Sequence, residues 1–306
     1  MEGKIIRGIA GFYYVQARDR TVWQCRARGV FRREGLKPLA GDNVTFEITH
    51  EGDREGNITD ILPRANMLIR PPVANVDGVL LTFAVKAPDV SHYLINRFLV
   101  LLRQKGLPAI LCFNKKDLAP EEETEAYLDI YRNAGCGLCA VSAKTREGLD
   151  ALRGLLKGRV TAVAGPSGAG KSSLINALSG EQLTQTGQLS KKIERGKNTT
   201  RHSELFLLPD ADTYVFDTPG FMSLTPEGLT AKELHRYYPE MEAAGAHCRF
   251  ATCTHLTEPG CAVREALEEG KISRVRYDAY RLYYDELSGQ RPVYVKKAKK
   301  APREGR

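Results

Sequence analysis

The chain of 306 residues carries 45 lysines and arginines against 37 aspartates and glutamates, which gives a formal net charge of +8. That length allows about two or three domains, and the basic balance fits a polyanionic partner as well as simple solubility. No apolar run approaches the ~20 residues that span a membrane, and the N-terminus lacks a signal-peptide core, so we expect a cytoplasmic protein with no membrane partner. The seven cysteines, an odd number, argue against a disulfide framework and for thiols or a metal site.

The first segment, residues 1–65, alternates short β-prone runs with polar turns. The candidate strands are 3–9, 12–17, 21–27, 43–49 and 56–61. Strands of this length and spacing predict a small closed barrel such as an OB-fold.

Basic and aromatic side chains are interleaved in this segment. They are Arg26, Arg28, Arg32, Arg33 and Lys37, with Phe12, Tyr13, Tyr14, Trp23 and Phe31. OB barrels bind single-stranded nucleic acid by stacking bases on aromatic rings beside a basic groove. We therefore predict RNA contact for the segment; the alternative is that the aromatics fill the barrel and the arginines are merely solvated.

The middle segment, residues 66–223, alternates β-type and helical patterns, which predicts a doubly wound parallel sheet. Strands are expected at 78–84, 109–113, 138–141, 159–164, 204–208 and 213–216, and helices at 93–103, 121–134, 148–156 and from 173 onward.

Short polar motifs follow three of these strands. They are Asn114-Lys115-Lys116-Asp117, Ser142-Ala143-Lys144 and Asp217-Thr218-Pro219-Gly220. Open α/β sheets bind ligands at the carboxyl ends of their strands, so these motifs are expected to share one edge.

Two of the motifs suit a guanine base. The Asp117 carboxylate can accept hydrogen bonds from the N1–H and 2-amino groups of guanine, a donor pair that adenine lacks, so it selects GTP over ATP. Asn114 is expected to brace the pocket, the Lys115 stem to cover a face of the base, and the Ala143 N–H to face the guanine carbonyl.

The phosphate-binding loop is the run Gly165-Pro166-Ser167-Gly168-Ala169-Gly170-Lys171-Ser172, which reads G-x-x-x-x-G-K-S. A Val- and Ala-rich strand precedes it and a helix that includes Ser173 follows, which is the context the motif needs. Its N–H groups and the helix N-terminus would meet anionic oxygens. Lys171 is expected to reach the β- and γ-phosphates and the Ser172 hydroxyl to ligate Mg²⁺. Asp217 would hold the Mg²⁺ shell, and the Gly220 N–H would sense the γ-phosphate.

The order of the motifs is rotated. An ordinary small GTPase has its phosphate loop first and its guanine motifs last, whereas here the guanine motifs come first. A circular permutation of this kind is tolerated because chain ends in compact domains are often neighbours. The loop after Asp217 now leads directly into the last domain, so it can transmit nucleotide state as a change in domain geometry.

The last segment, residues 224–306, contains the run Cys248-x4-Cys253-x-His255-x5-Cys261. Three thiolates and one imidazole can close a tetrahedral shell around Zn²⁺. The alternatives are free cysteines in a loop and a false ligand in His247. A lone Cys136-x-x-Cys139 pair suggests redox chemistry or half a zinc site, but we expect packing thiols there, as at Cys25 and Cys112.

Helices are expected at 229–237, 265–269 and 272–287. In the last of these, Ile272, Val275, Ala279 and Leu282 form an apolar stripe. Tyr277, Tyr280 and Tyr284 lie on another face, where packing is favoured over stacking on RNA. The tail from Lys296 onward is a like-charge block that either contacts nucleic acid or is simply solvated.

With these features together, the sequence resembles the circularly permuted GTPases that assist late maturation of the small ribosomal subunit, the RsgA family. The resemblance covers the barrel (1–65), the permuted G domain (66–223) and a zinc-binding helical domain (224–306) whose cysteines and histidine match the zinc knuckle of the family. It implies GTP hydrolysis to GDP and phosphate, Mg²⁺ with the nucleotide, a structural zinc, and the small subunit and its rRNA as partners of a monomer.

The stretch Arg195-Gly196-Lys197-Asn198-Thr199-Thr200-Arg201-His202 is the expected switch. We assign Thr200 to the Mg²⁺ shell, with Thr199 as the alternative. The family usually carries a histidine where this chain has Asn198, and Phe221 stands where Ras-like proteins orient water with a glutamine. Slow intrinsic hydrolysis stimulated by the ribosome is therefore expected, with Lys171, Asn198, Thr200 and Gly220 as the candidate catalytic residues.

Two other functions fit parts of the pattern. A P-loop kinase of a small molecule is one, although Asp117 argues against it. The other is a GTP-gated RNA-binding protein that acts on another partner, such as the large subunit or mRNA.

Overall fold

The computed structural model describes residues 1–29, 31, 35–69, 72–180, 204–209, 212–217 and 228–289. The chain divides into two compact units, one of Met1–Ser91 with Phe98–Pro226 and the other of His92–Arg97 with Glu227–Arg306. In the part of the chain that the structure describes, no helix combines the length and apolar character that a membrane crossing needs.

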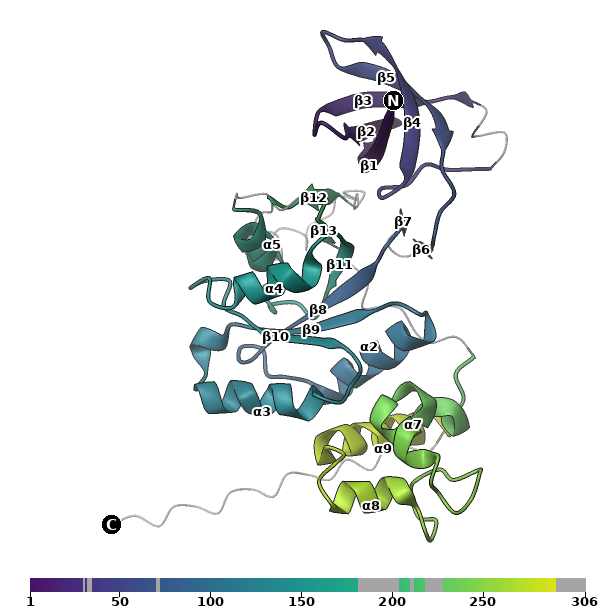
Figure 1. The fold of residues 1–306 in the computed structure, drawn as a ribbon, viewed down its shortest axis with the longest axis vertical. Coiled ribbons are helices and arrows are strands. Elements are labelled where there is room, and N and C mark those ends of the chain that lie inside the picture. Colours follow the sequence, from purple (N-terminus) through teal and green to yellow (C-terminus); the bar gives the residue numbers. More distant parts are fainter. Residues whose placement is uncertain are drawn as a thin grey trace, which may run out of the picture. The chain divides into compact units, whose positions relative to one another are not determined.

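The first unit begins with a closed barrel (Figure 1). Its strands are β1 (Glu2–Ile9), β2 (Phe12–Ala17), β3 (Val22–Ala27), β4 (Asn43–His50) and β5 (Glu55–Ile61), in the order β1-β2-β3-β5-β4. Alternate residues such as Ile5, Val15 and Phe46 point inward and are fully buried. The predicted OB-like barrel is confirmed, with strand ends within one residue of those expected.

A small hairpin follows the barrel. Its strands, β6 (Met67–Ile69) and β7 (Pro72–Ala74), are antiparallel, and Val73 bridges to Ala40. The sequence did not predict these strands, because each has only three residues and a proline opens the second.

The rest of the first unit is a six-stranded sheet in the order β10-β9-β8-β11-β13-β12. The strands are β8 (Gly78–Ala84), β9 (Ala109–Asn114), β10 (Gly137–Ala140), β11 (Val160–Ala164), β12 (Leu205–Leu207) and β13 (Tyr214–Asp217). Neighbouring strands are parallel except for β12, which pairs antiparallel with β13 at the sheet edge. The predicted parallel sheet is thus confirmed for the other strands. The edge strand β12 runs antiparallel to β13, which follows it in the chain, and consecutive antiparallel strands need only a short connection.

Helices cover both faces of this sheet. They are α2 (His92–Gln104), α3 (Glu121–Tyr131), α4 (Leu149–Leu156) and α5 (Lys171–Ser179), with a 3₁₀ turn at Lys116–Leu118. Figure 1 shows α4 and α5 on the face opposite α3. The central strands β8 and β11 are buried along their whole length, as a sheet covered on both faces requires.

The second unit contains η3 (Ala231–Tyr237), α7 (Pro239–Gly245), α8 (Ala262–Glu268) and α9 (Arg274–Leu287). The first is a 3₁₀ helix within the range 229–237 that was expected to be helical, and α7 was not predicted. The apolar stripe predicted for α9 is wrong in part: Val275 and Leu282 are only half-buried, while Arg276, Tyr277 and Tyr283 are buried. The tyrosine rings have more apolar area to bury, and their hydroxyls find partners. Packing is therefore confirmed as the use of Tyr277 and Tyr280.

The cysteines outside the last segment behave as packing residues where they lie in strands. Cys25 in β3 and Cys112 in β9 are fully buried, and Cys139 in β10 is paired in register with Cys112. Burial raises the pKa of the Cys25 thiol to about 11, which keeps it protonated and unreactive at neutral pH.

Candidate nucleotide site and metal centre

The phosphate loop connects the end of β11 to the first residue of α5, Lys171. Two of its glycines are sterically required. Gly165 has φ 145°, and a Cβ there would lie 2.0 Å from the Thr82 carbonyl of the neighbouring strand β8. Gly170 has φ 88°, and a Cβ there would lie 2.4 Å from the Asn114 side-chain nitrogen. The loop therefore packs too closely against its neighbours for any side chain at these positions.

Lys171 lies half-buried at the start of α5. Its Nζ donates hydrogen bonds of 3.0 Å to the carbonyls of Gly165 and Pro166. The ammonium group is thus held inside the phosphate loop by main-chain oxygens. Ser172 is half-buried and Ser173 exposed in the same first turn.

Asn114, the last residue of β9, joins three of the predicted motifs. Its Nδ2 donates to the Ala169 carbonyl of the phosphate loop at 3.0 Å, and its Oδ1 accepts the Ala143 N–H at 3.1 Å. The Asn114 side chain is 1% exposed, so these bonds are sheltered from water. The Ala143 N–H, which we expect to face the guanine carbonyl, thus donates to Asn114 in this structure, and it would form a three-centre bond if it contacted a ligand as well.

Asp117 and Ser142 lie together at the same edge. The Ser142 hydroxyl donates to Asp117 Oδ1 at 2.6 Å and accepts the Thr145 N–H at 3.0 Å. Ser142 is fully buried, whereas Asp117 is exposed. A fixed hydroxyl therefore orients a carboxylate that remains open to a ligand.

The lysines of these motifs point in different directions. Lys115 has the left-handed φ of 63°, and its ammonium hydrogen-bonds the Ala87 carbonyl in the loop after β8. Lys116 forms an ion pair with Glu147, and Lys144 is exposed.

The loop after β8 is a part of this site that the sequence reading missed. A Cβ on Gly168 of the phosphate loop would lie 3.4 Å from Pro88 Cδ. With the Lys115 bond to Ala87, this places the Ala87–Pro88 peptide against both the phosphate loop and the guanine motif. The only signal in the sequence was a proline shortly after a strand end, which is too common to single out.

Other predicted residues are located only in part. Asp217 ends β13 and pairs in register with Val163 of β11. Asn198, Thr199, Thr200, His202, Gly220 and Phe221 lie outside the described residues.

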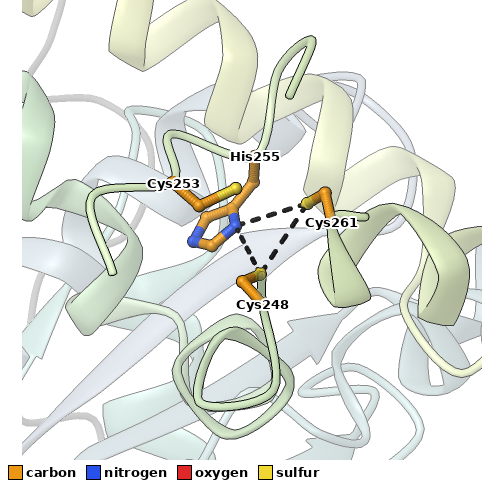
Figure 2. A group of neighbouring side chains, drawn as sticks. All are labelled: Cys248, Cys253, His255 and Cys261. Carbon is orange, nitrogen blue, oxygen red and sulfur yellow. Dashed lines mark hydrogen bonds between the residues drawn. The ribbon is translucent and has the colours of Figure 1, made fainter. Parts of the chain in front are cut away.

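In the second unit, four predicted ligands converge. Their ligand atoms, from Cys248, Cys253, His255 and Cys261, all lie within 4.8 Å of one another. Figure 2 shows the His255 ring directed at the thiols, with Nδ1 3.6 Å from Cys248 Sγ and 3.5 Å from Cys261 Sγ. The exposed His247 is not a member of the cluster.

The donor set fits a tetrahedral zinc ion. Zn–S bonds of about 2.3 Å and Zn–N bonds of about 2.0 Å at tetrahedral angles separate nitrogen from sulfur by about 3.5 Å and sulfur from sulfur by about 3.8 Å. The N–S distances match these values, and the Cys248–Cys261 separation of 4.0 Å is close. Burial lowers the pKa of His255 to about 4, so the imidazole is neutral at pH 7, the form that binds metal.

The loop that carries the cluster is fixed by its neighbours. Tyr277 of α9 donates to the His255 carbonyl at 2.6 Å, and Tyr280 donates to the Thr254 carbonyl at 2.7 Å. Glu258 accepts the N–H groups of Thr254 at 2.8 Å and of Leu256 at 3.1 Å. No sequence pattern singles out Glu258, because an acidic residue in a polar loop is ordinary.

Two family models and many curated proteins match this chain. A family model described as RsgA GTPase matches residues 61–226, and one described as RsgA N-terminal domain matches residues 2–58. The small ribosomal subunit biogenesis GTPase RsgA of Agathobacter rectalis is 46% identical over 300 residues, covering 95% of this chain and 99% of that protein. The protein of the same name from Bacillus anthracis is 42% identical, covering 96% of this chain and 99% of that one.

Two solved structures are similar to this chain over nearly its full length. The crystal structure of YjeQ from Thermotoga maritima is similar with a TM-score of 0.75 at 34% identity, covering 95% of this chain and 99% of that one. The crystal structure of YloQ, described as a circularly permuted GTPase, has a TM-score of 0.73 at 35% identity, covering 96% of each chain. A chain matched over nearly its full length by these proteins belongs to the RsgA family of circularly permuted GTPases.

Proposed function

We propose that this chain hydrolyses GTP to GDP and phosphate while bound to the small ribosomal subunit, and that it assists late maturation of that subunit. The observation that carries the nucleotide part is the bond between Asn114 and Ala169, which holds a guanine motif against the phosphate loop in an order rotated along the chain. The relatives named for small ribosomal subunit biogenesis support the partner. Work on a ribosomal subunit implies the cytoplasm as its location, and we propose a monomer.

The nucleotide would be held by groups already in place. Asp117, oriented by Ser142, would accept the guanine N1–H and 2-amino hydrogens, which selects GTP over ATP. Lys171 would exchange its bonds to the Gly165 and Pro166 carbonyls for phosphate oxygens when the nucleotide enters. Mg²⁺ would be held by Ser172, Asp217 and Thr200, and when bound it offsets the charge that develops on the phosphates.

Activation of the attacking water is the step for which the chain lacks the usual groups. Asn198 and Phe221 stand where a histidine and a glutamine would otherwise be found, and an apolar ring cannot orient water. We therefore propose that intrinsic turnover is slow and that the ribosome supplies the missing group or orders the switch.

We propose that the cluster of three cysteines and one histidine binds a metal with a structural role. Cys248, Cys253, His255 and Cys261 would hold one Zn²⁺ in a closed shell, with no position left for a substrate. The metal would fix the loop between α7 and α8, because binding free energy at such a site is also folding free energy.

The proposal is tested by two measurements on the full chain. Turnover of GTP is compared with and without purified small subunits, and a rise of about 10-fold or more is expected because a supplied catalytic group is worth at least that. Sedimentation with separated subunits in a non-hydrolysable GTP analogue should place the chain with small subunits alone. Equal turnover in both conditions, or sedimentation with large subunits, would overturn the assignment.

A further inference from the structure

The first barrel strand, β1, contains a β-bulge that changes the direction in which one arginine faces. The register of β1 against β2 pairs Ile5 with Val15 and Arg7 with Tyr14, so Ile6 is the extra residue of the bulge. In a regular strand Arg7 would share the face of Ile5, which is fully buried in the barrel. The bulge instead turns Arg7 to the outer face of the barrel, and re-aiming a side chain is a recurrent use of bulges.

On the outer face the Arg7 guanidinium is held from two sides. Its Cζ lies 4.1 Å from the centroid of the Tyr14 ring, which is a cation–π contact. Its Nη1 donates to Glu204 Oε1 at 3.1 Å, and the two side chains are 36% and 39% exposed. Glu204 immediately precedes β12, so this ion pair joins the barrel to the edge strand of the parallel sheet.

A second group of contacts joins the barrel to the neighbouring strand, β13. Tyr214, its first residue, donates its hydroxyl hydrogen to Gln16 Oε1 of β2 at 3.0 Å, and both residues are buried. Lys4 Nζ lies 5.8 Å from the centroid of the Tyr214 ring and donates to Asn43 Oδ1 at 2.7 Å. Because Tyr214 pairs with the last residue of β12, the barrel is bonded to the β12–β13 pair at both of its ends.

The ion pair of Glu204 lies at the end of β13 that carries Asp217. Strands β12 and β13 pair Leu205 with Phe216, and the same register continued by one residue places Glu204 opposite Asp217. On its other side Asp217 pairs with Val163 of β11, two residues before the phosphate loop begins. The barrel therefore contacts the sheet beside the edge at which the phosphate loop and Asp217 meet.

We infer that Arg7 is a positioning residue for Mg²⁺: by holding Glu204 it fixes the end of β13 where Asp217 lies, so the metal affinity of the nucleotide complex depends on the barrel. Strand β12 has only three residues and lies at the sheet edge, so it is a weakly held neighbour for β13 without this contact. An ion pair that orders the strand end in advance lowers the entropy cost of forming the metal site. The inference rests on the proposed function, in which Asp217 holds Mg²⁺, and deepens it by naming a residue of the barrel that acts on the same site.

Binding of Mn²⁺, used in place of Mg²⁺ because both ions prefer oxygen ligands, measures the effect without turnover. The full chain is held in excess over a non-hydrolysable GTP analogue, so that little free nucleotide competes for the metal, and the EPR signal of free Mn²⁺ is followed during a titration. Arg7→Met removes the charge and keeps an unbranched stem beside Tyr14, and Glu204→Gln removes the opposite charge. Arg18→Met is the matched control, because Arg18 pairs with Glu2 within the barrel.

Arg7→Met and Glu204→Gln should each weaken Mn²⁺ binding by about two- to fivefold, which is the scale of a partly exposed ion pair. The double variant should show no further loss, because both changes break the same interaction. Arg7→Lys, which keeps the charge, should retain most of the affinity, and Arg18→Met should bind as the unsubstituted chain does. Unchanged affinity in Arg7→Met, or losses that add in the double variant, would overturn the inference.

Asp217→Ala, titrated in the same way, separates the inference from the proposed function on which it rests. It should weaken Mn²⁺ binding more than either change in the ion pair, because it removes a metal ligand. If Asp217→Ala binds Mn²⁺ as tightly as the unsubstituted chain, the metal site of the proposed function is wrong and the inference falls with it. If Asp217→Ala loses Mn²⁺ while Arg7→Met keeps it, only the role of the barrel is wrong.

Discussion

The side-chain amide of Asn114 donates a hydrogen bond of 3.0 Å to the carbonyl of Ala169, 55 residues later in the chain. Asn114 ends β9 and Ala169 lies in the phosphate loop, so one buried amide joins the strand of the guanine motif to the loop of the phosphate motif. Its oxygen accepts the N–H of Ala143 at 3.1 Å, which adds the third motif. One side chain thus forms hydrogen bonds to two other motifs and connects all three.

Asn114→Ala should therefore weaken both the fold and the nucleotide site. It would leave the Ala169 carbonyl and the Ala143 N–H without their partner, and an unsatisfied buried polar group costs about 1–3 kcal/mol. We expect the urea midpoint to fall and the affinity for GDP to fall by about tenfold, since 1.4 kcal/mol corresponds to that factor. Asn133→Ala, at an exposed position after α3, is the control. An unchanged GDP affinity for Asn114→Ala would mean that the amide does not organise the site.

Asp117→Asn should exchange guanine for xanthine as the preferred base. A carboxylate can accept from both the N1–H and 2-amino groups of guanine, whereas an amide can accept from N1–H and donate to the oxygen that xanthine carries at position 2. We expect the affinity for GTP to fall by about 10- to 100-fold and that for XTP to rise, because one mismatched polar group costs about 1–3 kcal/mol. The control is Asp150→Asn, whose side chain is 98% exposed on α4. Loss of GTP binding without any gain in XTP binding would count against direct base contact.

The strands and the site edge could be predicted from the sequence because both depend on local patterns. Strands β3, β4 and β5 alternate buried and less buried residues. Each nucleotide motif directly follows a strand, where side chains such as Asn114 and Asp117 gather at one edge. The phosphate loop could be predicted as well, because its G-x-x-x-x-G-K-S motif is read from consecutive residues. The bond that Asn114 forms to Ala143 could not be predicted, since it depends on how two neighbouring strands end in space.

The second unit was less predictable because a charged side chain is buried in its core. Arg276 of α9 is 2% exposed, and its guanidinium bonds Glu240 at 3.0 Å and Asn96 at 2.8 Å. Hydropathy places arginine on the surface, so the predicted stripe of α9 ran through Val275 and Leu282 instead. Only the partners of a charged residue show that it can be buried, and a single sequence does not show which residues are partners.

Tyr277→Phe should lower zinc affinity without removing a ligand. The substitution deletes the hydroxyl that donates to the His255 carbonyl at 2.6 Å, and supports of this kind are worth about 10- to 100-fold in metal affinity. Competition with a colorimetric chelator measures the affinity independently of GTP turnover. Tyr284→Phe is the control, because that ring packs beside Tyr280 with centroids 6.1 Å apart and is only half-buried. Equal loss in both variants would point to packing and not to the hydroxyl bond.

Glu258 should make the loop of the metal cluster sensitive to acid. Burial raises the pKa of its carboxyl, but hydrogen bonds from Thr254 and from the backbone outweigh this and lower that pKa from 4.5 to about 2. A carboxyl whose pKa is lower in the folded than in the unfolded state stabilises the fold above its unfolded pKa, and this contribution is lost as the pH falls toward the folded value. Glu258→Gln should therefore be less stable than the unsubstituted chain at neutral pH, and this difference in stability should disappear between pH 4.5 and about 2.

Urea midpoints of both proteins after metal removal measure this stability gap without a contribution from zinc release. Glu265→Gln, on the exposed side of α8, is the control. A gap that keeps its size down to the acid end would show that the hydrogen bonds of Glu258 do not depend on its charge.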